Sequence, residues 1–190
     1  MHKKLTLSDQ PSMQHILINA FLFQLCWFSA VLMGSYWALL PLGLMFLHYL
    51  QVRGTTGLLV VLLLGVLGIM FDSLYLYLGI YHLDVQTAAL PLLNLPVWLV
   101  CLWLGFCLSL PLSLAWLVKK PVYFIVGCML LGPVSYLAGR RLQAIDFADI
   151  NIGFLVLEWA VFAFLVCLVL WPKLTAGTQL PIVSRKPGSC

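Results

Sequence analysis

Charged side chains are scarce in this sequence. Only 8% of its 190 residues are Asp, Glu, Lys or Arg, whereas 63% are hydrophobic. A soluble domain carries roughly 25% charged residues, and a single soluble core of this length cannot enclose so much apolar side chain. The composition therefore excludes a cytosolic enzyme, a disordered chain and a nucleic-acid-binding protein. It indicates an integral membrane protein.

The motifs of familiar membrane enzymes are missing as well. The four His form no HxxxH or HExxH array, and there is no GxGD or GxSxG sequence. The six Cys contain no CxxC pair, and none falls in a predicted outer loop, so structural disulfides are not expected. We predict no metal and no cofactor, and the residues assign no reaction class, so whether the protein is an enzyme stays open.

Long unbroken apolar runs favour membrane-spanning helices over a barrel. Barrel strands would alternate apolar and polar residues, whereas a spanning helix needs about 20 apolar residues. We expect an all-α bundle of six transmembrane helices in one membrane domain, 15–171, between tails at 1–14 and 172–190. The predicted spans are 15–34, 36–51, 57–80, 96–117, 121–139 and 151–171.

The Lys and Arg residues predict the orientation of this bundle. An even number of spans places both termini on one side, together with most of the ten basic residues. That side holds Lys3, Lys4, Arg53, Lys119, Lys120, Lys173, Arg185 and Lys186. Only Arg140 and Arg141 fall on the other side. The positive-inside rule therefore predicts cytoplasmic termini.

Asp72 is an ionisable residue inside a predicted span, where burial of a charge is costly and usually functional. It belongs to a stripe on one helix face that is otherwise made of small or aromatic residues. The stripe consists of Gly65, Gly68, Asp72, Tyr75 and Gly79. Small residues permit close helix contact, so we expect Asp72 to face the bundle interior, with the Ser73 hydroxyl nearby.

Glu158 is the second acidic residue inside a span, and Asn151 lies two helical turns before it on the same face. Tyr136 and Arg140 share a face at the outer end of the fifth predicted span, and Arg141 follows. We expect these residues to lie with Asp72 in the outer half of the bilayer, where opposite charges lower the cost of burial.

Two interpretations of this polar cluster stay open. It is either a buried ion-pair network that fixes helix register or an outward-facing pocket that binds a substrate or carries protons. Arg140 or Arg141 could also contact only lipid phosphate at the surface. Asn19 and Gln24 in the first span are secondary polar candidates, with bonding between helices as the default. Trp27 and Trp103 lie deep enough to be packing residues or pocket walls.

Four segments together resemble a bacterial inner-membrane family of unknown function, catalogued as domain-of-unknown-function family 2878. They are NAFLFQLCWF (19–28), FDSL (71–74), PVWLVCLWLGFCLSLPLSLAWL (96–117) and GPVSYLAGRRLQAI (132–145). The chain departs from the family pattern in pairing Arg140 with Arg141 and in carrying Gln143 where Gly is common. The resemblance implies a small multi-pass inner-membrane protein. It also implies a link to membrane lipids, because members are often encoded near enzymes that modify fatty-acyl chains.

The leading hypothesis is therefore a lipid-associated inner-membrane protein. It would bind a phospholipid or fatty-acyl group, or assist its modification, through a polar pocket open to the outer leaflet. Arg140 or Arg141 would hold a phosphate or carboxylate. The alternatives are a proton-coupled carrier or channel for small solutes and a structural subunit of a larger membrane complex. The expected partners are membrane lipid and either another membrane protein or further copies of the chain, without nucleic acid.

Overall fold

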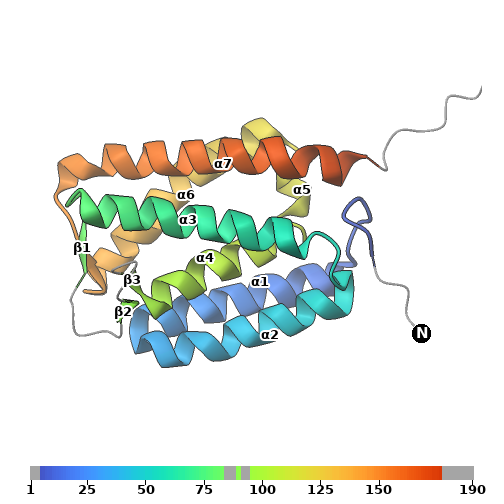
Figure 1. The fold of residues 1–190 in the computed structure, drawn as a ribbon, viewed down its shortest axis with the longest axis horizontal. Coiled ribbons are helices and arrows are strands. Elements are labelled where there is room, and N and C mark those ends of the chain that lie inside the picture. Colours follow the sequence, from blue (N-terminus) through green and yellow to red (C-terminus); the bar gives the residue numbers. More distant parts are fainter. Residues whose placement is uncertain (1–4, 84–88, 91–94, 177–190) are drawn as a thin grey trace, which may run out of the picture.

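The computed structural model describes residues 5–83, 89–90 and 95–176, which form helices joined by short connections (Figure 1). The helical elements are α1 (Met13–Phe28), η1 (Ser29–Met33), α2 (Ser35–Arg53), α3 (Leu58–Tyr77), α4 (Val97–Ser109), α5 (Ala115–Val118), α6 (Pro121–Arg141), η2 (Asp149–Asn151) and α7 (Ile152–Thr175). The strands are β1 (His82–Leu83), β2 (Ala89–Leu90), β3 (Leu95–Pro96) and β4 (Ile145–Asp146). The predicted all-α bundle is confirmed, with two short antiparallel strand pairs, β1 with β4 and β2 with β3, at one end.

The long helices lie side by side and run back and forth between two ends (Figure 1). On one side of the bundle α1, α2 and α4 pack together and α3 packs on α4, while α6 packs along α7 on the other. Contacts between α3 and α7 join the two sides. The start of α1 and the end of α7 lie at the same end of the bundle, at the right of Figure 1.

Four helical segments are long and apolar enough to cross a membrane: Met13–Met33, Leu58–Tyr77, Pro121–Arg141 and Asp149–Thr175. The protein is therefore a multi-pass membrane protein. The second predicted span corresponds to α2, and the fourth is divided into α4 and α5, so six complete spans are not established. Parts of the predicted tails, residues 1–4 and 177–190, lie outside the described residues.

Glycines mark two tight connections between the helices. Gly34, with φ 85°, separates η1 from α2, and Gly57, with φ 72°, precedes α3. Both backbones lie at positive φ, a region that glycine enters without the steric penalty of a Cβ atom. Between α5 and α6, Pro121 occupies the first turn of α6, where its missing N–H costs no helical hydrogen bond. These local signals explain why the helix boundaries fall close to the predicted ones.

The fourth predicted span is interrupted at a proline, and two side chains from other helices form hydrogen bonds with the irregular segment. Pro111 and a run of turns occupy residues 110–114 between α4 and α5. The Arg53 Nη2 donates to the Pro111 carbonyl at 2.6 Å, and the Ser113 hydroxyl donates to Asn19 Oδ1 at 2.6 Å. The backbone N–H of Ser113 donates to the same Asn19 oxygen at 3.4 Å. An irregular segment of a membrane protein is tolerated when protein groups satisfy its backbone in this way.

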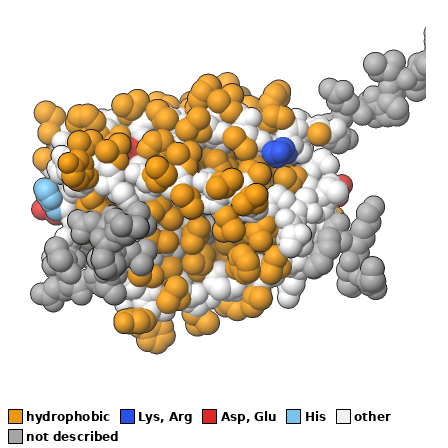
Figure 2. Space-filling model, in the orientation of Figure 1, with side chains coloured by type: hydrophobic (Ala, Val, Ile, Leu, Met, Phe, Trp, Pro, Cys, Tyr) orange, Lys and Arg blue, Asp and Glu red, His pale blue; other side chains and the backbone are white. Residues whose placement is uncertain are grey.

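The exterior of the bundle is apolar, unlike that of a soluble protein. Large hydrophobic side chains such as Leu17, Phe21 and Leu130 are exposed, whereas Arg53 and Asp72 are fully buried. The face in Figure 2 is mostly hydrophobic, with few charged side chains. Exposed apolar surface of this extent fits contact with lipid.

Candidate functional site

Asp72 lies at the centre of a buried hydrogen-bond cluster. It belongs to α3, is 0% exposed, and accepts hydrogen bonds on both carboxylate oxygens. Trp103 Nε1 of α4 donates to Oδ2 at 2.5 Å, and the Tyr136 hydroxyl of α6 donates to Oδ1 at 2.7 Å. The Tyr81 hydroxyl donates to the Asp72 backbone carbonyl at 3.3 Å. The Asp72 carboxyl group is thus held by one donor from α4 and one from α6, and the backbone of the same residue accepts from Tyr81.

Glu158 of α7 lies beside the Asp72 carboxyl, and it is 2% exposed. Neither Glu158 oxygen accepts a hydrogen bond from a donor group among the described residues. The structure therefore brings together three of the predicted site residues, namely Asp72, Tyr136 and Glu158. The inward orientation of the α3 stripe is confirmed for Gly65, Gly68, Asp72 and Tyr75, while Gly79 lies beyond the helix end.

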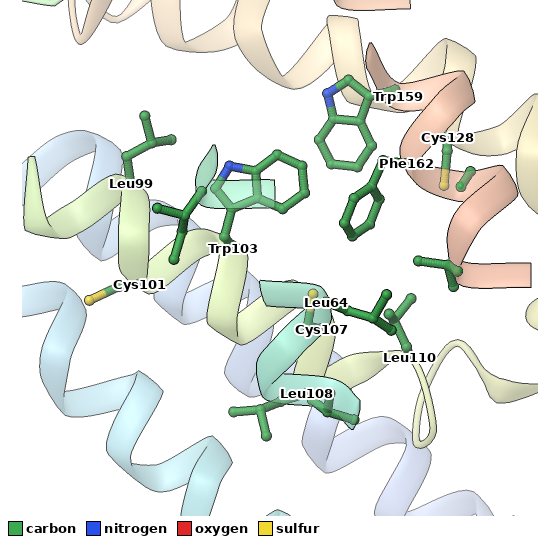
Figure 3. Close-up of a cluster of buried hydrophobic side chains, with 14 of the residues drawn as sticks. Leu64, Leu99, Cys101, Trp103, Cys107, Leu108, Leu110, Cys128, Trp159 and Phe162 are labelled. Atoms are coloured by element: carbon green, nitrogen blue, oxygen red, sulfur yellow. The ribbon is translucent and has the colours of Figure 1, made fainter. Parts of the chain in front are cut away.

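Trp103, which donates to Asp72, belongs to a pair of stacked tryptophans with Trp159, and both rings are labelled in Figure 3. The Trp103 and Trp159 rings have centroids 5.1 Å apart and an interplanar angle of 17°. A Cβ atom at Gly68 would collide with the Trp103 ring, and one at Gly132 would collide with the Trp159 ring. The stack is therefore enclosed between a glycine of α3 and a glycine of α6, which fixes both rings.

A groove of about 500 Å³ opens beside the stack, between α1, α4 and α6. Its lining is apolar and rich in aromatic residues, with Gln24, Ser109, Ser113, Ser135 and Tyr136 as polar exceptions. On α6 it extends from Phe124 to Tyr136, twelve helical steps or about 18 Å along the axis. Trp27 and Trp103 both line it, and Trp103 is also packed in the hydrophobic core.

The groove and the acidic cluster share two side chains. Trp103 and Tyr136 line the groove, and the same two residues donate to the Asp72 carboxylate. Trp159, which follows Glu158 in sequence, also lines the groove. The cluster therefore forms the layer of side chains directly behind one wall of the groove.

The predicted arginine partners of Asp72 lie elsewhere. Arg140 Nη1 contacts Asp149 Oδ1 at 2.5 Å, and its Nε lies 3.6 Å from Asp146 Oδ1. The Arg140 guanidinium also lies 5.2 Å from the centroid of the Phe147 ring. The expected neutralisation of Asp72 by Arg140 is wrong, because two acidic residues in the connection after α6 are closer in sequence and satisfy the arginine at the surface. Arg141 is exposed, away from the cluster.

The remaining polar candidates have separate places. The Ser73 hydroxyl donates to the Ile69 carbonyl at 2.8 Å within its own helix. Asn151 Nδ2 donates to the Ile80 carbonyl at 2.5 Å and ties the start of α7 to the end of α3. Asn19 supports the break after α4, as described above, whereas Gln24 is exposed and lines the groove.

Arg53 is a buried residue that sequence reasoning placed only by its charge. Its guanidinium donates to the backbone carbonyls of Thr6, Asp9 and Pro111, and it is 0% exposed. The Arg53 charge also acts on a neighbouring basic residue, Lys119. The pKa of Lys119 is lowered mainly by partial burial and in addition by repulsion from Arg53. Arg53 thus joins the N-terminal segment to the break between α4 and α5. Its position after the last apolar residue of a span gave no signal of this role.

Comparisons with known proteins give a family and no activity. No curated protein and no solved structure matches the chain. Residues 16–169 match the family described as "Protein of unknown function (DUF2878)", which confirms the resemblance found in the sequence. Because the match spans most of the chain and all of the helices around the groove, this protein belongs to that family.

Proposed function

We propose that this protein binds the apolar chain of a membrane lipid in the groove between α1, α4 and α6. The observation that carries the proposal is the groove itself, about 500 Å³ in volume and lined mainly by apolar and aromatic side chains. That volume lies within the range of about 300–1,000 Å³ typical of ligand sites. In a multi-pass membrane protein, the ligand most available to an elongated apolar groove is lipid.

The length of the groove also supports an acyl chain. Its α6 wall extends about 18 Å along the helix axis, which is more than half of a hydrocarbon core of about 30 Å. A compact solute would leave much of such a groove unfilled. An extended chain parallel to the helices would contact Phe23, Phe106 and Leu131 together.

The lipid head group would lie toward the end of the bundle that carries β1 and β4. A narrower cavity continues past Tyr136 to Gly139 and Ile145, and Ile145 also borders a polar hollow beside His82 and Arg140. Arg140 is already paired with Asp146 and Asp149. Arg140 borders the hollow, and the next residue, Arg141, is exposed and forms no ion pair with another described residue, so we assign the phosphate or carboxylate contact to one of these two arginines.

The positive-inside rule would place this end outside the cytoplasm of a bacterial inner membrane. Among described residues, the opposite end carries Arg53, Lys119, Lys120 and Lys173. Single cysteines at Asp149 and at Lys120, in a chain lacking its native cysteines, would test this orientation. We expect a membrane-impermeant maleimide to label the first from outside and the second only after the membrane is opened.

The lipid proposal is tested by filling the groove. Gly127 lines it, and the nearest atom to a Cβ there is Leu117 Cδ2 at 3.9 Å. Gly127→Phe should occupy the groove without a clash at the backbone. Gly43→Phe is the matched control, since Gly43 lies in α2 with no atom within 4 Å of its Cβ position.

The measurement is native mass spectrometry of lipid retained by the purified protein. We expect the unaltered protein and Gly43→Phe to retain at least one lipid, and Gly127→Phe to retain less than half as much. Equal retention by the two variants, with both folded, would contradict the groove as the binding site.

A proton-coupled carrier is the second candidate, and the contact between Asp72 and Glu158 favours it. Buried acidic residues in spans are typical of proton relays. In vesicles containing a pH-sensitive dye, a carrier would give proton flux that Glu158→Gln abolishes. Lipid retention without any proton flux would exclude the carrier and leave the lipid proposal intact.

A further inference from the structure

The carboxyl groups of Asp72 and Glu158 meet inside the bundle without a basic partner. Asp72 comes from α3 and Glu158 from α7, and both are almost completely buried. The other titratable side chains that interact with the pair are tyrosines from α3, from the segment after it and from α6. They are Tyr75, Tyr81 and Tyr136.

No described Lys, Arg or His is paired with either carboxyl group. The nearest candidate from sequence, Arg140, is held by Asp149 and Asp146 at the end of the bundle. Two ionised carboxylates in contact would repel strongly at low dielectric. A single proton between them removes one charge and supplies the hydrogen bond that Glu158 otherwise lacks.

The donors to Asp72 connect this pair to the groove. Trp103 and Tyr136 each donate to one Asp72 oxygen and each line the groove. Trp159 stacks on Trp103 at 5.1 Å, lines the groove, and adjoins Glu158 in sequence. A change in the charge of the carboxyl pair therefore acts on three side chains that a ligand would touch.

We propose that Asp72 and Glu158 form a proton-binding site whose occupancy is coupled to occupancy of the groove by an apolar chain. This inference rests on the proposed function and adds its regulation. A chain in the groove excludes water from the wall that covers the pair, and the drier surroundings favour the protonated, less charged form. Thermodynamic linkage then requires the proton to strengthen ligand binding by the same factor.

The sign of the effect follows from this linkage. Ligand binding takes up a proton, so affinity for the apolar chain falls as pH rises through the titration of the pair. We expect a loss of about tenfold between pH 5 and pH 9, within the range of about 5- to 150-fold common for coupled sites.

The test uses a phosphatidylcholine with a pyrene-labelled acyl chain, because its head group does not titrate over this pH range. Energy transfer to pyrene from the tryptophans that line the groove reports binding to the purified full-length protein in detergent. Glu158→Gln should keep the fold, since its amide can donate to Asp72 as the shared proton does, and should bind with equal affinity at all pH values. Ser73→Ala is the control, because Ser73 bonds only to Ile69 in its own helix, and it should keep the full pH dependence.

The outcomes are distinguishable. Binding by the unaltered protein that does not vary between pH 5 and pH 9 would overturn the proton coupling and leave lipid binding in place. Pyrene transfer at no pH would overturn the proposed function and this inference with it. A pH dependence that persists in Glu158→Gln would assign the proton to another group and also overturn the inference.

Discussion

Trp103 and Trp159 stack with ring centroids 5.1 Å apart and an interplanar angle of 17°. They come from α4 and α7, helices on the two sides of the bundle. The Trp103 ring packs on Gly68 of α3, and the Trp159 ring packs on Gly132 of α6. The stack thus connects four helices in the layer between the acidic pair and the groove. Its geometry depends on the absence of side chains at Gly68 and Gly132.

Gly132→Ala should destabilise the protein although alanine favours helices. The new Cβ would collide with the Trp159 ring, and overpacking of this kind costs about 1–3 kcal/mol. The helix-propensity gain of about 1 kcal/mol offsets only part of that cost. Thermal unfolding followed by circular dichroism in detergent should show a lower Tm.

Gly43→Ala is the matched control, because it also replaces a glycine inside a helix but should not lower the Tm. No atom lies within 4 Å of its Cβ position, so only the propensity gain remains and Tm should stay equal or rise. A lower Tm for Gly43→Ala, or an unchanged Tm for Gly132→Ala, would contradict the packing of Trp159 on Gly132.

The sequence predicts the inward-facing residues well where small and polar residues recur at helical spacing. The stripe of Gly65, Gly68, Asp72 and Tyr75 is buried as expected, because only one helix face can accept close contact and a carboxyl group together. Glu158 is buried near Asp72 for the same reason. Periodicity identifies the inward face, because that face is determined by the residues of one helix and does not depend on which helices pack against it.

The sequence does not predict which polar groups pair across the bundle. Arg140 is one helical turn from Tyr136, yet it pairs with Asp149 in the connection before α7. From the sequence, Arg53 is one of several basic residues that follow a predicted span. In the structure it donates to three backbone carbonyls. Both outcomes depend on the path of irregular segments, for which hydrophobic periodicity carries no information.

Replacing Arg53 tests its role as the support of the break between α4 and α5. Arg53→Ala removes the donor for three carbonyls, of Thr6, Asp9 and Pro111. Hydrogen bonds from a charged donor contribute about 1.5–3 kcal/mol each, so we expect a loss of about 3 kcal/mol or more in the free energy of unfolding. Lys120→Ala, at an exposed basic residue of the same bundle end, should have little effect on unfolding in SDS titrations.

A rescue experiment separates charge from geometry at this site. Arg53→Lys keeps the charge but offers a single ammonium group in place of the planar guanidinium. The Arg53 guanidinium reaches Pro111 through Nη2 and Asp9 through Nη1. Arg53→Lys should therefore recover less than half of the lost stability, and full recovery would show that charge alone is needed.

Gln143 has a backbone conformation that favours glycine. Its φ is 61°, and it is the only described residue other than glycine with positive φ. That region costs an L-residue about 1–2 kcal/mol. Gln143→Gly should raise the free energy of unfolding by up to about 1 kcal/mol, because the greater flexibility of unfolded glycine cancels part of the gain. Gln143→Ala keeps the penalty and should give no increase.

The separation of Asp72 from Arg140 predicts that substitutions at the two positions act independently. Asp72 is bonded to Trp103 and Tyr136, whereas Arg140 is bonded to Asp149 and Asp146. Residues without shared partners give additive effects. The Tm shift of the double variant Asp72→Asn with Arg140→Gln should equal the sum of the two single shifts. If Arg140→Gln instead restored stability lost in Asp72→Asn, the two side chains would have to interact, and the assignment of Arg140 to the surface would be wrong.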